Sequence, residues 1–380
     1  MSYIYFNNAA TSWPKPKEVT AAVSTSFRLP YNESGRAVEN KLLNYPKLTR
    51  ELLSKFFNAK NPENFQFTSN ATESLNITIH GFVSKQKEKI HVITTDLEHN
   101  SVLRPLKTLE KGGKISLSIV PSDKKGYIRL IDFKKNVQPD TRLAVMNHAS
   151  NVIGTVQDIN KIGKYLKSKG IFFIVDVAQS AGHIKLDFKR MNCDAFCFTG
   201  HKSLFGIPGI GGFYIDKPES IEPLKQGGTG IFSQYPFHPD KMPLKFEAGT
   251  LNYPGIISLY AGIKFIQKTG LSKIRKKTES MVAYIIKELS KEKNIHIYNK
   301  SPDISLISFN IKGIDNEDIG YILLKQHNII CRTGLHCAPL IHQKIDNGKG
   351  CIRISLSYFN TMKQCRVMLK IIQKIAQQTE

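Results

Sequence analysis

The sequence predicts an α/β fold, with a mainly parallel sheet wrapped by helices in a large domain and a smaller α+β domain after it. The chain has 380 residues, 41% of them hydrophobic, which is enough for one large domain and a second smaller one. Short β-branched runs alternate with helical segments up to about residue 268, a pattern typical of parallel strands joined by helices. Beyond a long charged segment the order of strands and helices changes, which indicates the second domain.

Seven apolar runs are the expected strands of the large sheet: 64–68, 90–94, 115–120, 142–147, 171–175, 195–198 and 211–215. Helical patterns lie at 72–84, 101–111, 158–169 and 258–268, and the long amphipathic segment is 272–292. In the smaller domain we expect strands at 304–311, 329–332 and 351–355 and helices at 316–327 and 362–377. We expect the large domain to span 14–258 and the small domain to comprise 1–13 and 259–380.

The net charge of +23 raises the question of a nucleic-acid partner. A basic binding module predicts clustered arginine interleaved with stacking aromatic residues. Here 11 of the 54 basic residues are arginine, lysine is dispersed along the chain, and Trp13 is the single tryptophan. The composition therefore disfavours nucleic-acid binding and indicates solvated surface lysines. A basic surface that steers an acidic partner protein is the alternative.

The chain contains no apolar run of about 18 residues, so we expect no membrane span. Its first residues lack a signal-peptide pattern. The six cysteines, all in the second half, have neither the spacing of a disulfide framework nor that of a zinc site. We therefore expect a cytoplasmic protein with no metal ligands.

Candidate functional residues follow the expected strands, because ligands of open α/β sheets bind at the carboxyl ends of the strands. Lys202 lies among small, hydroxyl and glycine residues just after the run 195–198. A lysine taken into a pocket has a lowered pKa, and its amine can form a Schiff base with an aldehyde cofactor. Considered alone in so lysine-rich a chain, Lys202 is better explained as a solvated lysine in a surface turn.

Three further strand ends carry polar residues. The segment 69–74 opens a helix, whose free N–H groups can bind an anion, although an ordinary helix cap has the same composition. His99 can stack on a planar ring or move protons, or be structural. Asp176 ends a very apolar strand and needs a cationic partner if buried, unless it caps a helix. Together with Lys202, these features supply each group needed to bind pyridoxal 5′-phosphate (PLP).

Four segments, 147–154, 175–180, 199–202 and 246–250, resemble the class V aminotransferase superfamily of PLP enzymes, which have the fold-type I transferase architecture. The segment 332–339 is similar to the cysteine desulfurase and selenocysteine lyase branch of that superfamily. The resemblance extends from residue 7 to residue 361.

The resemblance implies PLP-binding roles for Ala71, Thr72, His99, Asn151, Asp176, Gln179, Thr199, His201, Lys202 and Thr250. It implies catalytic roles for Lys202, Cys337 and His99, and substrate binding by Asn151, Arg332 and Arg353. Lys202 would form the Schiff base, Asp176 would keep the ring nitrogen protonated, and Cys337 would take the sulfur. Thr250 would reach the phosphate of a neighbouring subunit, which implies a homodimer. His336 and Arg332 would favour the thiolate form of Cys337.

The implied activity is that of a sulfurtransferase. L-cysteine would become L-alanine, with a persulfide on Cys337 and sulfur transfer to an acceptor protein, as in iron–sulfur cluster assembly. The pattern at 332–338 is closer to the second group of desulfurases, which use dedicated acceptors, although Leu335 stands where that group often has histidine. The alternatives are a selenocysteine lyase acting on L-selenocysteine, and another class V reaction in which Cys337 is a small core residue.

Overall fold

A computed structural model describes residues 3–30 and 43–378. The large domain contains a seven-stranded sheet in the order β2-β8-β7-β6-β5-β3-β4. Strand β8 is antiparallel to β2 and β7, and the other neighbouring strands are parallel. The predicted mainly parallel sheet is therefore confirmed. Its strands are β2 (Phe65–Thr68), β3 (Ile90–Thr95), β4 (Ile115–Val120), β5 (Thr141–Asn147), β6 (Phe172–Asp176), β7 (Ala195–Thr199) and β8 (Gly211–Ile215).

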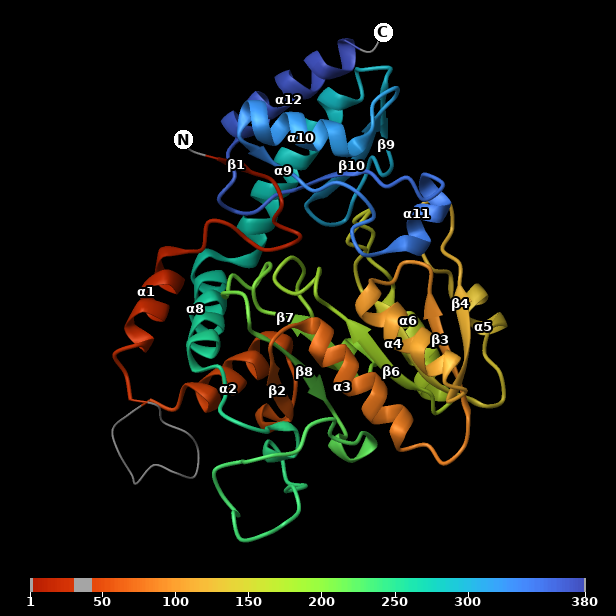
Figure 1. The fold of residues 1–380 in the computed structure, drawn as a ribbon, viewed down its shortest axis with the longest axis vertical. Helices are drawn as coiled ribbons and strands as arrows, with labels where there is room; N and C mark the ends of the chain where they lie inside the picture. Colours follow the sequence, from red (N-terminus) through yellow and green to blue (C-terminus); the bar gives the residue numbers. More distant parts are fainter. Residues whose placement is uncertain (1–2, 31–42, 379–380) are drawn as a thin grey trace.

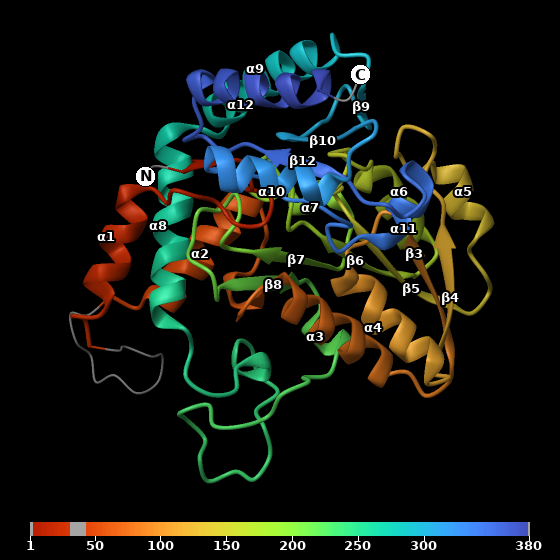
Figure 2. The same cartoon turned by 45° about the horizontal axis from the view of Figure 1, so that its top comes forward.

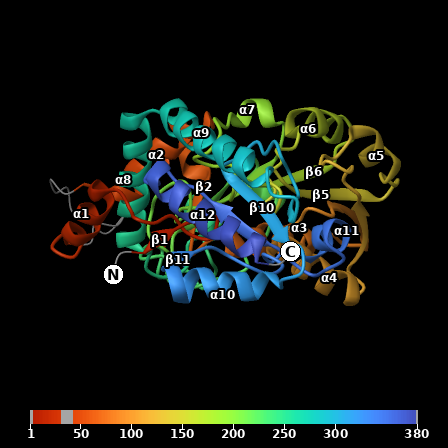
Figure 3. The same ribbon diagram turned by 90° about the horizontal axis from the view of Figure 1, so that it is seen from above.

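Helices cover both faces of this sheet, which explains why its central strands are apolar on both sides. Figure 3 shows α3 and α4 on one face and α6 and α7 on the other. Every residue of β6 and β7 is buried. The covering helices are α3 (Ala71–Ser84), α4 (Asn100–Lys111), α6 (Ile159–Ser168) and α7 (Phe188–Met191), and α5 (Leu130–Lys135) lies near α6.

Three more helices pack together at one end of the large domain (Figure 1): α1 (Lys17–Ser26), α2 (Tyr45–Phe57) and α8 (Tyr253–Thr269). The sequence predicted a start at 258 for the last of them, which is wrong. The helix begins at Tyr253 because Asn252 caps it by accepting a hydrogen bond from the Gly255 amide at 3.1 Å. Pro254 occupies the first turn, where a missing N–H group costs little.

The small domain has its own hydrophobic core, formed by a three-stranded antiparallel sheet and the helices packed on it. Figure 2 shows α9 and α12 side by side over this sheet. The elements are α9 (Leu271–Leu289), β9 (Ile295–Ile297), β10 (Leu306–Ile311), α10 (Asn316–His327), α11 (Pro339–Ile345), β12 (Ile352–Ser355) and α12 (Met362–Gln377). A short parallel pair, β1 (Ile4–Tyr5) with β11 (Ile329–Ile330), brings the first described residues to this domain. The domain boundaries given above stay a prediction.

The segment after β1 connects the two domains beside the strand end that carries Lys202. Asn8 donates a side-chain hydrogen bond to the Ser355 carbonyl at 2.9 Å, and the Ser12 amide donates to the His201 carbonyl at 3.0 Å. The end of β7 and the end of β12 are thereby held close to one short stretch of chain. Among the described residues, no helix is both long enough and apolar enough to cross a bilayer.

The backbone around Lys202 gives a first prediction. Gly182 has φ +84°, and an added Cβ would lie 2.3 Å from the carbonyl oxygen of Ser203, the residue after Lys202. Gly170 also has a positive φ, +65°, but nothing lies within 4 Å of its added Cβ. We expect Gly170→Ala to cost about 1–2 kcal/mol of backbone strain, and Gly182→Ala about 1–3 kcal/mol more because the neighbouring backbone has to move.

The measurement is the free energy of unfolding of both variants and the wild type in a urea titration. Gly170→Ala is the matched control for the strain of a left-handed residue. Equal losses in the two variants would show that the close approach to Ser203 is unimportant.

Candidate active site

A hollow lies at the carboxyl ends of the central strands of the large sheet and contains about 490 Å3 of space, part of it open to solvent. It is lined by Asn70, Ala71, Thr72, His99, Ser101, Asn147, Ala149, Asn151, Asp176, Ala178, Gln179, Thr199, His201 and Lys202. Every residue predicted to bind the cofactor is in this set except Thr250. The lining residues come from segments far apart in the chain and meet because parallel strands end at one edge.

Lys202 lies just after β7 and lines the hollow. Removal from water lowers the pKa of its amine from 10.5 to about 8, in spite of the opposing field of the Asp176 carboxylate. The nearby guanidinium groups of Arg353 and Arg332 lower it further. A large fraction of Lys202 is therefore neutral near pH 8, as a nucleophilic amine needs to be.

Asp176 ends β6 and is buried. Its Oδ1 accepts a hydrogen bond from the Ala178 amide at 2.8 Å. Burial raises the pKa of this carboxyl above its ordinary value, and the positive charge of Lys202 opposes the increase. A cation placed in the hollow next to Asp176 would favour the ionised carboxylate.

The hollow has an anion-binding end at the start of α3. Asn70 caps this helix by accepting a hydrogen bond from the Glu73 amide at 3.0 Å. The amides of Ala71 and Thr72, in the first turn, have no carbonyl acceptor within the helix. The buried Thr199 Oγ1 and His201 Nδ1 have no hydrogen-bond partner within the described part of the chain. These donors fit a phosphate group at the positive end of the helix dipole.

His99 caps α4 and faces the hollow. Its Nδ1 accepts from the Ser101 amide at 3.1 Å, so the proton of the neutral ring is on Nε2. Burial, reinforced by the charge of Lys202, lowers the pKa of His99 to about 4. Gln179, another lining residue, donates to the Ala9 carbonyl at 3.0 Å and is thereby held in place.

The small domain contributes the Cys337 loop and two arginines, Arg332 before the loop and Arg353 on β12. The Arg332 guanidinium donates to Cys337 Sγ at 3.3 Å. Arg353, on β12, donates to the Asn151 carbonyl at 2.8 Å, and Asn151 in turn donates to the His336 carbonyl at 2.7 Å. Arg353 is 1% exposed, and its Nε has no partner in the part of the chain that the structure describes. Burial, with the charge of Arg332, lowers the pKa of Arg353 to about 9.

His336 does not add positive charge beside the thiol. Burial, with the positive charge of Arg353, lowers the pKa of its imidazole to about 2, so it is neutral at physiological pH. The charge next to Cys337 therefore comes from Arg332.

Thr250 lies elsewhere. It is exposed in the loop before α8, and it does not line this hollow. This position leaves its side chain free for a neighbouring molecule.

Sequence reasoning missed several residues around the hollow. Glu98 is fully buried next to His99; its Oε1 accepts from the Thr95 hydroxyl at 2.6 Å and from the Asn147 amide at 3.1 Å. Burial raises the pKa of this carboxyl to about 8. Lys15 donates to the His201 carbonyl at 2.8 Å, and burial lowers the pKa of its amine to about 8. Nothing in the local sequence distinguishes either residue from a surface charge.

A nucleophilic lysine, an apposed carboxylate and an anion site at the ends of parallel strands define a transferase of the aminotransferase type. The class-V aminotransferase family model matches residues 4–368. "Probable cysteine desulfurase" from Pyrococcus abyssi is 31% identical, over 98% of this chain and 94% of the relative, and its namesake from Methanothermobacter thermautotrophicus is 31% identical, over 98% and 95%. The solved "Apo structure of Cysteine Desulfurase from Thermococcus onnurineus NA1" has a TM-score of 0.90 at 30% identity, covering 99% of this chain and 95% of that one.

The chain therefore belongs to the class-V aminotransferase family, in its cysteine desulfurase branch. Members of this family are PLP-dependent enzymes. The predicted family, fold and enzyme class are confirmed, and the relatives support the desulfurase prediction over that of a selenocysteine lyase.

The buried Glu98 gives a second prediction. Its folded-state pKa, about 8, is above the ordinary value of 4.5, so the folded protein holds a proton that the unfolded chain has released between these two pH values. The contribution of Glu98 to stability is therefore present at low pH and is lost as pH rises toward 8, by up to about 1.4 kcal/mol per pH unit. Glu98→Gln, which cannot ionise, should remove this dependence.

We expect the thermal midpoint of Glu98→Gln, measured relative to that of the wild type, to increase as the pH rises from 5.5 to about 8. Exposed Glu63→Gln is the control for loss of a carboxylate elsewhere. If the midpoints of wild type and Glu98→Gln changed in parallel with pH, the buried proton would be absent.

Proposed function

We propose that the chain is a PLP-dependent cysteine desulfurase that converts L-cysteine to L-alanine and carries the sulfur as a persulfide on Cys337. The observation that carries the proposal is the position of the Cys337 loop. The small domain holds this thiol next to Arg332, and both groups lie close enough to Lys202 to influence the pKa of its amine, which supports the proposal.

The residues present fit PLP. The amides of Ala71 and Thr72, with the unpartnered Thr199 and His201 side chains, would hold the phosphate. Asp176 would pair with the ring nitrogen, His99 would stack on the ring and Gln179 would bond its phenolic oxygen. When bound, PLP supplies an aldehyde for the Lys202 amine and an electron sink for the substrate's α-carbon.

The substrate end of the hollow suits a carboxylate. The free Nε of buried Arg353 is an uncompensated donor, and Asn151 lies beside it as the acceptor of another Arg353 hydrogen bond. An amino-acid carboxylate would relieve the repulsion between Arg353 and Arg332, which is one cause of the lowered Arg353 pKa. We assign Arg353 and Asn151 to the carboxylate of L-cysteine, with Arg332 shared between substrate and thiol.

Two residues of this chain move or hold protons. Lys202, with a pKa of about 8, is the base for the α-proton once its amine is free. His99 is neutral and has its Nε2 proton available to the hollow, since Nδ1 is occupied by the Ser101 amide.

Cys337 completes the reaction without an outside oxidant. Its sulfur forms a bond to the sulfur of the substrate as the substrate's carbon–sulfur bond breaks, so the sulfur is oxidised while the carbon skeleton is reduced to alanine. Each cysteine consumed gives one alanine and one persulfide. The persulfide sulfur then passes to an acceptor, which we infer to be a protein used in iron–sulfur cluster assembly or another sulfur-requiring process.

The remaining parts of the proposal concern assembly and location. The exposed Thr250 supports a homodimer in which it contacts the phosphate bound by the partner. Six free cysteines support a reducing compartment, which we infer to be the cytoplasm. The use of L-selenocysteine is the second candidate activity.

The cofactor is tested through Lys202. The purified protein should be yellow, and borohydride should attach PLP covalently to the peptide that contains Lys202, as seen by mass spectrometry. Lys202→Ala should lose this attachment, while Lys15→Ala, the other lysine whose pKa is about 8, should retain it. A colourless protein that cannot be reconstituted with PLP would refute the proposed function.

Cys337→Ala tests the sulfur step. We expect the variant to lose at least about 100-fold in alanine formation from L-cysteine, because the nucleophile is absent. It should still bind PLP. Cys331→Ala, a partly buried thiol on the same segment, is the matched control and should keep wild-type turnover. A transaminase would keep turning over in both variants, and turnover of L-selenocysteine alone would favour the lyase.

A further inference from the structure

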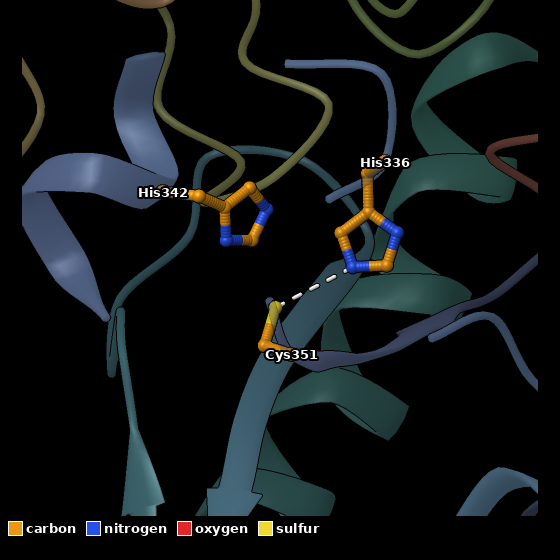
Figure 4. Close-up of side chains that lie close together, drawn as sticks. All are labelled: His336, His342 and Cys351. Atoms are coloured by element: carbon orange, nitrogen blue, oxygen red, sulfur yellow. Dashed lines mark hydrogen bonds between the residues drawn. The ribbon is translucent and has the colours of Figure 1, made fainter. Parts of the chain in front are cut away.

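A buried cluster of three potential metal ligands lies beside the Cys337 loop. His336 directly precedes Cys337, His342 lies in α11, and Cys351 lies just before β12. Figure 4 shows the two imidazole rings and the thiol around a common space. The candidate ligand atoms all lie within 4.8 Å of one another, and the three residues are buried.

The spacing of these atoms is close to that of a tetrahedral zinc site. Zn–N bonds of about 2.0–2.1 Å and a Zn–S bond of about 2.3 Å place neighbouring ligand atoms about 3.3–3.6 Å apart. His336 Nε2 and Cys351 Sγ are 3.4 Å apart. From the outer limit of 4.8 Å, zinc binding would need a contraction of about 1.2–1.5 Å, which side-chain rotation would have to supply.

The protonation pattern also suits a metal. Asp346 Oδ2 accepts from His342 Nδ1 at 2.5 Å, which places the ring proton on Nδ1 and leaves the lone pair on Nε2. That Nε2 atom is buried and has no hydrogen-bond partner among the described residues. A carboxylate behind a histidine is the arrangement that orients zinc-binding imidazoles.

We propose that His336, His342 and Cys351 bind a zinc ion, with Asp346 as the positioning residue behind His342. The charges balance, because Zn2+ is offset by the Cys351 thiolate and the Asp346 carboxylate. Binding releases the thiol proton to solvent. Three protein ligands leave one tetrahedral position for a water molecule.

Bound zinc ties the residue beside Cys337 to two fixed elements, α11 and the start of β12. Asn151 already holds the His336 carbonyl from the large domain, so the metal fixes the same residue through its side chain. The site therefore restrains the base of the Cys337 loop. Its effect on sulfur transfer rests on the proposed function, but metal binding itself does not.

The test is metal binding by the holoenzyme in a Cys337→Ser background, which removes the neighbouring reactive thiol. Zn2+ is titrated against a chromophoric chelator, and Co2+ is used as a spectroscopic probe in the red part of the visible range, where PLP does not absorb. We expect one metal per chain and a tetrahedral cobalt spectrum. Cys351→Ala and His342→Ala should each lose at least about tenfold in affinity, and Asp346→Asn about 10–100-fold.

Cys331→Ala is the matched control, since its thiol lies outside the cluster, and it should bind as the wild type does. Thermal unfolding without metal identifies any variant that fails to fold. Asp346→Asn retains all three ligands, so it still tests the proposal if a ligand variant does not fold. Absence of binding, or binding unchanged in folded Cys351→Ala and Asp346→Asn, would overturn the proposal. Either outcome is independent of desulfurase activity.

Discussion

Positive charge withdrawn from water at one place is the constraint on which the active site depends. Arg332 and Arg353 lie close enough to Lys202 to lower its pKa, and the Asp176 carboxylate opposes their effect. Desolvated like charges are unfavourable, and the lowered pKa values of Lys202 and Arg353 are the direct result. The same repulsion makes the hollow receptive to anions, so that a phosphate at one end and a carboxylate at the other would stabilise what is otherwise a strained arrangement of charge.

Two domains are needed to bring these charges together. The large sheet supplies Asp176 and Lys202 from the ends of β6 and β7, which are adjacent parallel neighbours. The small domain supplies Arg353 from β12 and the Cys337 loop from the segment before it. Hydrogen bonds from Arg353 to Asn151 and from Asn151 to His336 join the two contributions. Substrate binding and sulfur capture are therefore coupled to the way in which the domains meet.

The sequence predicted the parts of this arrangement that are local. Asp176 ends one strongly apolar strand and Lys202 follows another. Ligands of open α/β sheets bind at the carboxyl ends of the strands, so both residues could be predicted to lie at the site. The helices α1 and α2 were not predicted. The strand β9 was also missed, because a three-residue element has little periodicity of its own and depends on packing.

Burial of charge was the least predictable feature. Glu98 stands next to His99 in a polar segment, yet it is fully buried and accepts hydrogen bonds from Thr95, at the end of β3, and from Asn147, at the end of β5. Likewise, the spacing of residues 336, 342 and 351 has no zinc signature, since the cluster arises from a loop, a helix and a strand start that meet only in the folded protein. The burial and the neighbours of such side chains depend on tertiary structure and cannot be predicted from a local sequence pattern.

The Cys337 loop has to satisfy two opposing demands. In the proposed function, its thiol would have to meet the substrate in the hollow and then present sulfur to an acceptor outside. His336 and Cys337 both have left-handed φ values, 49° and 58°, and their carbonyl groups accept hydrogen bonds from Asn151 and Asn100. Such conformations persist when surrounding contacts fix them. Gly334, with φ +88°, and the exposed Leu335 lie on the other side of this fixed pair. The Gly334 amide donates to Asn316 Oδ1 at 2.8 Å, and its carbonyl accepts from the Cys351 amide at 3.1 Å. The backbone of the Cys337 loop is therefore held on both sides of the thiol.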